Sequence, residues 1–261
     1  NTTILGLIDG IGDALHSISK AVSGYLSDKF RKRKPFIWFG YLMGSLSRLG
    51  YAFSTAWWHL IPFKVLDRMG KIRGAPRDAM VADVSTRKTR GRNFGILRMM
   101  DNLGAVTGIL LSMLLLNVLG YRNLFILASV PSLIGVALII SLIKDKPGKF
   151  GKKFELKLLG KRYRRFLLAS VIFSLGYFSY SFLMLYAKSF GFDKSFLPIF
   201  YLIFTLTASV FSLPFGRLSD RIGRKKIVTV SYFLWVFVLL IAFVFKNLFV
   251  PFVVFFLYGL Q

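Results

Sequence analysis

Long apolar segments, separated by short basic tracts, recur along the whole of this 261-residue sequence. A bilayer core about 30 Å thick needs roughly 20 apolar residues in a helix. A hydrophobic content of 55% and a mean hydropathy of +0.59 are too high for a soluble domain, so the sequence predicts an all-α membrane protein. We expect about nine spans, at roughly 3–24, 35–55, 57–84, 94–118, 121–143, 166–190, 195–216, 227–246 and 249–261.

The formal net charge of +25 is concentrated between the apolar segments. Basic tracts follow the first, third, fifth and seventh predicted spans, at 29–34, 87–92, 144–165 and 217–226, whereas the intervening turns carry little charge. The positive-inside rule places all four tracts in the cytoplasm and predicts a multi-pass protein of the cytoplasmic (inner) membrane. A nucleic-acid binder would collect its charge on one soluble face, so we expect no nucleic-acid partner.

The longest basic tract divides the chain. We expect a helical half at 1–143, a cytoplasmic linker at 144–165 and a second, partial helical half at 166–261. The linker is either a solvated loop that sets topology or a segment held against anionic lipid. Because the chain has no cysteine, disulfides and thiolate metal sites are excluded, and we expect no metal or other cofactor.

One loop occurs twice. The segment GYLSDKFRKRK at 24–34 aligns with GRLSDRIGRKK at 216–226, and six predicted spans separate the copies. An even number of spans puts both loops on one side of the membrane, as in two parallel halves related by an axis along the membrane normal. Arg31 stands in the first copy where the second has Gly223, so the two loops are expected to turn differently.

This repeated pattern resembles the signature loop of the major facilitator superfamily, and the resemblance covers the whole chain. It implies two pseudo-symmetric six-helix halves, with Asn1 at the start of the family's second helix and Gln261 inside its tenth. The chain begins without Met and ends in an apolar run, so we expect both ends to be truncated and the first, eleventh and twelfth helices to be missing.

The repeated loop also suggests a cytoplasmic gate. Gly24 and Gly216 allow close helix approach, and the carboxylates of Asp28 and Asp220 can hold a neighbouring helix N-terminus or a basic side chain. The alternative is that these charges only set topology, which needs the basic residues but not the aspartates. The predicted gate residues are Gly24, Asp28, Arg77, Asp78, Arg98, Asp101, Gly216, Asp220 and Arg224.

Ionisable residues inside the spans are concentrated before residue 120, and such groups are functional candidates by default. Asp9, Asp13, His16 and Lys20 follow one another at helical spacing, so they form one stripe on the first span. We expect either a proton pathway or a structural polar seam between helices. The predicted proton or substrate pathway comprises Asp9, Asp13, His16, Lys20, Arg48, Asp67 and Arg68.

The charged third span resembles the family's fourth helix, whose arginine is associated with coupling, and its APRDA stretch at 75–79 is similar to that of a prokaryotic subgroup. Arg48 needs a partner, for which Asp9, Asp13 and Asp67 are candidates. In the next span, a Gly104-x-x-x-Gly108 face predicts close helix packing, although Ile109 stands where the family's exporters usually have proline.

The spans after residue 166 carry aromatic residues in place of charges. Tyr177, Tyr180 and Met184 share one helical face, and Tyr201 lies on the next span. These residues form either a wall for an apolar or amphipathic cargo or ordinary core and lipid-facing packing.

Together these features predict a secondary transporter that works by alternating access, with proton-coupled export of a small amphipathic compound as the leading hypothesis. The alternatives are uptake of a small nutrient or anion, and a membrane sensor or scaffold that transports nothing. No nucleotide-binding P-loop or catalytic constellation is present, so we expect neither direct use of ATP nor an enzyme. The expected partners are a small-molecule cargo, protons and lipid, and the protein is expected to be a monomer.

Overall fold

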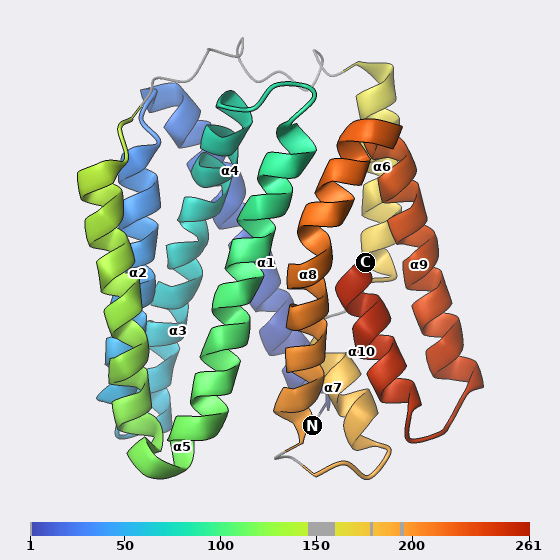
Figure 1. Cartoon of the computed structure of the whole chain (residues 1–261). Coiled ribbons are helices and arrows are strands. Elements are labelled where there is room, and N and C mark those ends of the chain that lie inside the picture. The colour runs from blue at the N-terminus through green and yellow to red at the C-terminus, as the bar shows by residue number, and fades with distance from the viewer. Residues whose placement is uncertain (1, 146–159, 178–179, 194–195) are drawn as a thin grey trace. The chain divides into compact units, whose positions relative to one another are not determined.

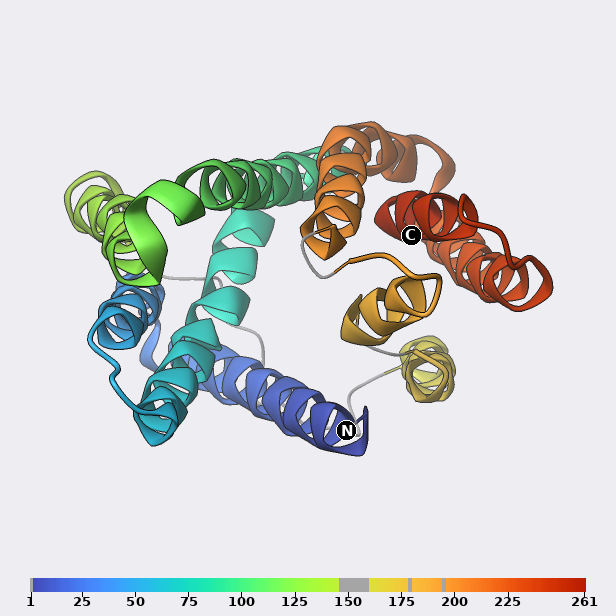
Figure 2. The same cartoon turned by 90° about the horizontal axis from the view of Figure 1, so that it is seen from below.

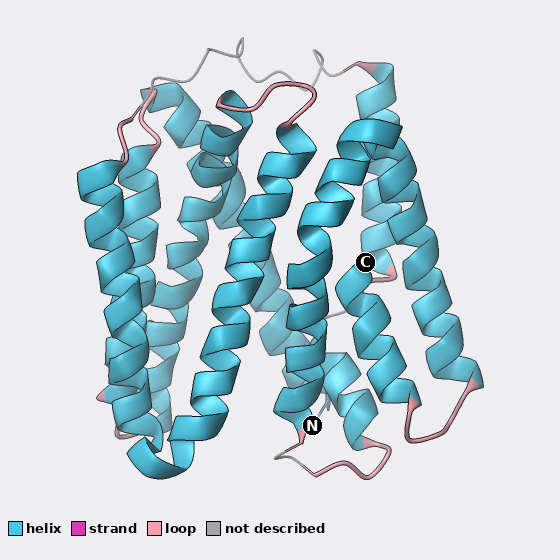
Figure 3. Cartoon of the chain, viewed as in Figure 1, coloured by secondary structure: helices cyan, strands magenta, loops and turns pink. Residues whose placement is uncertain are grey.

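Every regular element of the chain described here is helical (Figure 3). The computed structural model describes residues 2–145, 160–177, 180–193 and 196–261. The elements, labelled in Figure 1, are α1 (Thr2–Phe30), α2 (Lys34–Ala52), η1 (Trp57–His59), α3 (Leu60–Met69), η2 (Gly70–Arg73), α4 (Gly74–Asp83), α5 (Arg90–Leu142), α6 (Lys161–Leu175), α7 (Tyr180–Lys188), α8 (Leu197–Ile222), α9 (Arg224–Val244) and α10 (Val250–Leu260). The predicted all-α class agrees with this architecture.

Four candidate membrane spans are found by length and composition within the described residues, at Arg90–Leu142, Tyr163–Lys188, Leu197–Ile222 and Arg224–Val244. The helix α1 is long enough to cross a bilayer, but Asp9, Asp13 and Lys20 interrupt its apolar sequence. The predicted third span is divided into α3, η2 and α4, and α10 has only 11 residues. The count of nine spans therefore stays a prediction.

Two predicted spans, 94–118 and 121–143, lie within the single element α5. Gly120 interrupts it with φ 68° and ψ 170°, a conformation that only glycine adopts readily. The helix turns sharply there, at the lower end of the green ribbon in Figure 1. The absence of a Cβ atom thus allows two helices to be joined without a polar loop.

The chain forms two compact units. The first comprises Asn1–Thr86 with Leu111–Phe150, and the second comprises Arg87–Leu110 with Gly151–Gln261. Each unit contains one copy of the repeated loop, because the first copy joins α1 to α2 and the second joins α8 to α9. The division into two six-helix halves with a linker at 144–165 remains a prediction, and most of that linker, 146–159, lies outside the described residues.

In the first unit, the α3–η2–α4 segment packs against both α1 and α2 (Figure 2). Glycine permits the closest approach. A Cβ atom at Gly40 of α2 would lie 2.7 Å from the carbonyl oxygen of Gly70 and 2.7 Å from the Cβ of Arg73. Farther along α2, Ser47 Oγ donates a hydrogen bond of 2.8 Å to the carbonyl oxygen of Phe63. This packing holds the charged η2 segment between two helices.

In the second unit, a hydrophobic core joins α7, α8, α9 and α10, and α10 lies against α8 and α9 (Figure 2). The fully buried residues at its centre are large and apolar, namely Phe200, Trp235, Val238, Val254 and Phe255. On α8 this core involves the N-terminal part of the helix, around Phe200, whereas the second copy of the loop begins near its C-terminal end.

Candidate functional site

The second copy of the loop binds the N-terminus of α5 through its aspartate. Asp220 lies in the last turn of α8, and its two carboxylate oxygens accept hydrogen bonds of 2.8 Å each from the backbone N–H groups of Gly91 and Arg92. The first N–H groups of a helix have no partner within the helix, and a negative charge there is favourable. Arg224 reinforces this contact, since its guanidinium lies 3.5 Å from the carbonyl oxygen of Arg87.

Small residues allow α5 and α8 to approach closely enough for that contact. A Cβ atom at Gly95 would lie 2.7 Å from the carbonyl oxygen of Ser212, and one at Gly216 would collide with the Gly91 carbonyl. Ser209 Oγ adds a hydrogen bond of 3.1 Å to the carbonyl oxygen of Met99. The predicted role of Gly216 in close packing is therefore consistent with its position.

The predicted close packing at Gly104 and Gly108 is wrong, because a Cβ atom at either position would meet nothing within 4 Å. The glycines of α5 that do pack closely are Gly91 and Gly95, which have the same four-residue spacing. The spacing alone does not reveal which face of a helix meets a neighbour.

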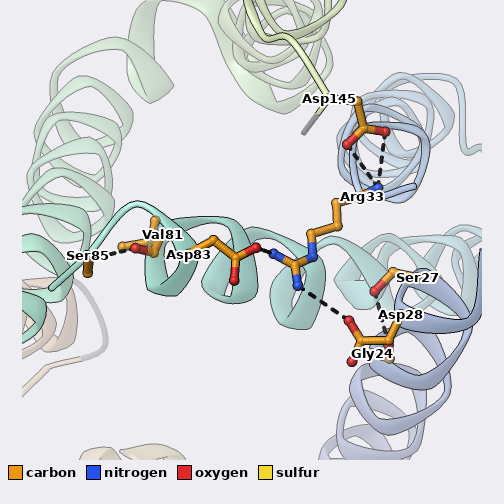
Figure 4. Close-up of polar contacts among 8 residues, drawn as sticks. All are labelled: Gly24, Ser27, Asp28, Arg33, Val81, Asp83, Ser85 and Asp145. Carbon is orange, nitrogen blue, oxygen red and sulfur yellow. Dashed lines mark hydrogen bonds and ion pairs between the residues drawn. The ribbon is translucent and has the colours of Figure 1, made fainter. Parts of the chain in front are cut away.

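The first copy of the loop forms a network around Arg33 (Figure 4). The Arg33 side chain is only 8% exposed and bridges Asp83, at the end of α4, and Asp28, whose carboxylate lies 3.4 Å away. The Asp28 side chain is 67% exposed, so it is a peripheral member of this network. The corresponding aspartates thus have different partners: Asp28 meets a guanidinium, and Asp220 meets a helix N-terminus.

The N-terminus of α2 is held by a residue that follows α5. Both carboxylate oxygens of Asp145 lie 3.2 Å from the backbone nitrogen of Arg33, which donates to them (Figure 4). Lys34 Nζ donates a hydrogen bond of 2.6 Å to the carbonyl oxygen of Ile140. The end of α5 and the start of α2 are therefore joined at the first copy of the loop.

The two loops turn through residues with positive φ at the same position of the repeat. Arg31 has φ 54°, whereas Gly223 has φ 95° and ψ 141°. The Gly223 conformation is essentially restricted to glycine, while Arg31 lies in the left-handed helical region at an energetic cost. The two turns differ in geometry, in line with the expectation drawn from the Arg31 substitution.

On α1, the face that packs against the α3–η2–α4 segment carries Gly12, Lys20 and Gly24. A Cβ atom at Gly12 would lie 3.4 Å from the Arg68 guanidinium, and one at Gly74 would lie 2.8 Å from Lys20 Cε. A Cβ atom at Gly24 would lie 3.3 Å from the Cβ of Ala75. This predicted gate glycine therefore packs inside the first unit.

The stripe of titratable residues lies beside this packed face. His16 is half-buried and interacts electrostatically with Lys20, Lys71, Arg68 and Asp13. Asp13 is exposed, and the side chain of Asp9 lies outside the described part of the structure. The structure thus brings His16 and Lys20 towards the charges of α3 and η2.

Arg48 forms hydrogen bonds with uncharged groups. Its guanidinium donates to Ser132 Oγ at 2.6 Å and to the carbonyl oxygen of Gly44 at 3.3 Å. Neither Asp13 nor Asp67 is its partner among the described side chains, so those two candidates are wrong. The separation of 84 residues between Arg48 and Ser132 explains why the sequence did not reveal this contact.

The remaining predicted gate charges form local pairs. Arg77 Nε lies 3.8 Å from Asp78 Oδ1, and its guanidinium also donates to the Tyr41 hydroxyl at 3.3 Å. Arg98 and Asp101 form an ion pair of 3.3 Å one turn apart on α5. Both pairs connect neighbours along one helix, and Arg77 additionally links α4 to α2.

The predicted cargo wall lies in an aromatic cluster of the second unit. The rings of Tyr180 and Tyr201 stack at 5.1 Å, and the hydroxyl groups of Tyr177 and Tyr258 form a hydrogen bond of 2.7 Å. Phe204 stacks on Tyr258 at 4.7 Å. Met184, by contrast, packs against the hydrophobic core of this unit.

Several residues that organise these contacts were not predicted from the sequence. Tyr258 and Trp235 complete the aromatic cluster, and Trp235 Nε1 donates to the carbonyl oxygen of Gly176 at 3.2 Å. Arg33 and Asp83 form the central ion pair of the first loop. A buried arginine in a basic tract differs from its neighbours only through tertiary contacts, although the position of Asp83 at a predicted span end was a usable signal.

No group of three or more histidine, cysteine or acidic side chains suited to a metal ion occurs among the described residues. The polar contacts instead tie helix ends together, twice, at the two copies of one loop. A helical membrane protein with this repeated loop and with charged residues inside one unit belongs to the class of polytopic transport proteins.

The chain belongs to the Major Facilitator Superfamily, whose sequence profile matches residues 2–260, so the resemblance drawn from the repeated loop is confirmed. It is 39% identical over 245 residues to an uncharacterized MFS-type transporter of Methanocaldococcus jannaschii, covering 88% of this chain and 61% of that relative. It is 26% identical over 106 residues to uncharacterized proteins of Mycobacterium bovis and Mycobacterium tuberculosis, covering 40% of this chain and 26% of each relative. The family consists of secondary transporters of small molecules in membranes and is generally not enzymatic.

Proposed function

We propose that this protein is a secondary active transporter that works by alternating access and exports a small amphipathic compound in exchange for protons. It is a monomer in the cytoplasmic membrane with its basic loops in the cytoplasm. The observation that carries the proposal is the contact of Asp220 with the first N–H groups of α5. Alternating access requires helix contacts that are stable in one state and separable in another.

The Asp220 contact meets that requirement. It consists of two charge-assisted hydrogen bonds at a helix end, and it contains no apolar side chain that would have to be exposed on separation. The network of Arg33, Asp28 and Asp83 lies at the equivalent loop and is likewise polar. We assign both to the cytoplasmic gate, together with Gly24, Arg224 and the local pairs Arg77–Asp78 and Arg98–Asp101.

The proton pathway of the proposal is the polar region between α1 and α3. Asp13, His16 and Lys20 lie along α1, and His16 interacts with Arg68 and Lys71 of the neighbouring segment. Arg48 and Asp67 complete the proposed pathway, with Asp9 on the preceding turn of α1. Acidic and basic groups in such an arrangement can bind and release protons during a transport cycle.

The tyrosine cluster supports an amphipathic cargo. Tyr177, Tyr180 and Tyr201 present both aromatic faces and hydroxyl groups, and about two fifths of the Tyr177 and Tyr180 surfaces is exposed. Aromatic side chains with a polar tip contact the apolar and polar parts of one molecule. Met184 belongs to the supporting core rather than to this surface.

A vesicle assay tests the proposal. The protein is reconstituted into proteoliposomes, a pH gradient is imposed, and the movement of radiolabelled benzoate, benzamide and benzylamine is followed. These probes share one aromatic ring and differ in charge. Because benzoic acid and neutral benzylamine also cross lipid unaided, movement is counted only above that in protein-free vesicles under the same gradient. We expect at least one probe to be driven by the gradient beyond this level, with a direction that identifies exchange against protons, and Asp13→Asn to reduce its dependence on pH. If no probe moves in either direction, the proposal fails.

A second candidate function is uptake of a small nutrient or anion. It is favoured by the surplus of positive side chains around η2, where Arg68, Lys71 and Arg73 lie within six residues. The same vesicle assay distinguishes the two candidates, because cotransport and exchange move the probe in opposite directions for a given pH gradient.

A further inference from the structure

The short η2 helix places positive charge in the interior of the first unit. Its residues, Gly70–Arg73, form a 3-10 helix between α3 and α4 and pack against both α1 and α2. Short 3-10 segments within a longer helix often mark functional positions, and interrupted helices line substrate sites in transporters. The positive residues on and beside η2 are Arg68, Lys71 and Arg73.

Arg73 has several protein partners. Its guanidinium donates to the carbonyl oxygen of Gly70 at 2.7 Å and lies 4.6 Å from the centre of the Tyr41 ring. A second carbonyl oxygen, that of Gly40, lies 3.5 Å away. We therefore assign Arg73 a structural role, joining η2 to α2.

Lys71 and Arg68 have no such partners. Within the described part of the chain, neither forms an ion pair or a side-chain hydrogen bond. The Nε atom of Arg68 is buried without a hydrogen-bond partner, and a Cβ atom at Gly12 of α1 would lie 3.4 Å from the Arg68 guanidinium. Arg68 thus has an unsatisfied donor in the interior of the unit, and the half-buried Lys71 lies close to it in the chain.

The surroundings of Lys71 do not neutralise it. Among the described side chains, Lys71 interacts electrostatically with Arg48, Arg68 and Arg73, and with the acid Asp67. The formal charges of these five described groups, four positive and one negative, sum to +3. From α1, His16 also faces Lys71 and Arg68, and the Asp13 carboxylate beside it is exposed. We call Arg48, Arg68, Lys71, Arg73 and Asp67 the η2 charge cluster.

Unneutralised charge at this place is unfavourable for the protein alone. Cations inside a membrane protein are costly unless they are paired, and a structural ion network would be close to neutral. A bound anion would supply the missing negative charge and accept hydrogen bonds from the cationic side chains. We propose that the η2 charge cluster binds the anionic group of the transported compound, a carboxylate or phosphate, through Lys71 and Arg68. This inference rests on the proposed transport function and specifies its cargo as an organic anion.

The first test measures stability without any ligand. Lys71→Gln and Lys71→Met are compared with the parent protein in detergent or nanodiscs, in buffer with chloride as its only anion. Because each variant removes one of four mutually repelling charges, we expect a higher unfolding temperature. A lysine that served a structural ion pair would give a lower unfolding temperature, and that result would overturn the assignment. Lys64→Gln is the matched control, since Lys64 lies on α3 in an exposed position.

The second test measures binding with benzoate, benzamide and inorganic phosphate as probes. We expect benzoate or phosphate to raise the unfolding temperature of the parent protein and of Lys64→Gln, and benzamide to have no effect. In Lys71→Gln the apparent affinity for the anion should fall about tenfold or more. Equal stabilisation by benzamide, equal anion affinity in Lys71→Gln, or no effect of either anion would contradict the inference.

The binding and vesicle experiments can fail independently, so they test the anion site and the transport function separately. If benzoate binds at Lys71 but never crosses the vesicle membrane, the anion site stands and the proposed transport function fails. If benzamide or benzylamine is transported and neither anion binds, the transport function stands and the anion site is refuted.

Discussion

Replacing Asp220 with asparagine tests the contact between α8 and α5 directly. The carboxylate accepts two hydrogen bonds of 2.8 Å from Gly91 and Arg92. Asparagine keeps one acceptor oxygen, loses the negative charge and presents an NH₂ group to the second N–H. A hydrogen bond to a charged group contributes about 1.5–3 kcal/mol, so we take the loss as about 2 kcal/mol.

That free energy determines how much faster the backbone amides at the start of α5 should exchange with solvent. Amide hydrogen exchange at a helix end reports its local opening equilibrium. A loss of about 2 kcal/mol corresponds to roughly 30-fold faster exchange, since 1.4 kcal/mol is a factor of ten. Hydrogen exchange with mass spectrometry on peptides covering residues 88–94 measures this change.

The matched control is Asp193→Asn, because Asp193 is an exposed aspartate in the same unit, far from α5 in the chain. It should leave exchange at residues 88–94 unchanged. If Asp220→Asn accelerates exchange by less than twofold, the carboxylate does not hold the α5 N-terminus in solution. The gate role proposed for Asp220 would then lose its basis.

Three further substitutions test the packing and the loops, with the unfolding temperature as the measurement. Gly95→Ala should lower it, because the new methyl group would lie 2.7 Å from the Ser212 carbonyl oxygen, whereas Gly104→Ala faces open space and should be neutral or stabilising; equal effects would contradict the packing. Arg31→Gly should stabilise by about 0.5–1 kcal/mol, since it relieves a left-handed conformation, and a clear loss of stability would refute that strain. Arg33→Gln should destabilise by about 1–2 kcal/mol, because it removes a buried guanidinium that pairs with two partly exposed carboxylates, and an effect below 0.5 kcal/mol would show that the network contributes little.

Several features of the fold were predictable because they depend on residues that are close together in the sequence. Apolar segments predict helices by length and composition, and the described residues are helical as expected. The repeated loop predicted the family, since glycine, serine, aspartate and the basic tail recur at fixed spacing. The expected capacity of its aspartates to hold a helix N-terminus or a basic side chain matches the geometry of Asp220 and Asp28, respectively.

The sequence did not predict which residues from different helices contact one another. The contact of Arg48 with Ser132 spans 84 residues, and nothing in the sequence favours a serine over the aspartates nearby. The face of α5 that packs closely uses Gly91 and Gly95 rather than Gly104 and Gly108, although both pairs have the same spacing. A spacing pattern identifies a face of a helix but carries no information about the element that covers it.

The sequence by itself determined that this protein is helical, that it belongs to a membrane transport family and that the ionisable residues inside its predicted spans are concentrated before residue 120, because hydropathy and motif spacing are properties of the chain alone. Only the tertiary structure decided which charges are neutralised. Arg33 and Arg73 have partners, whereas Arg68 keeps an unsatisfied donor in the described part of the first unit. Electrostatic energy depends on the distances between groups from different helices, and folding sets those distances.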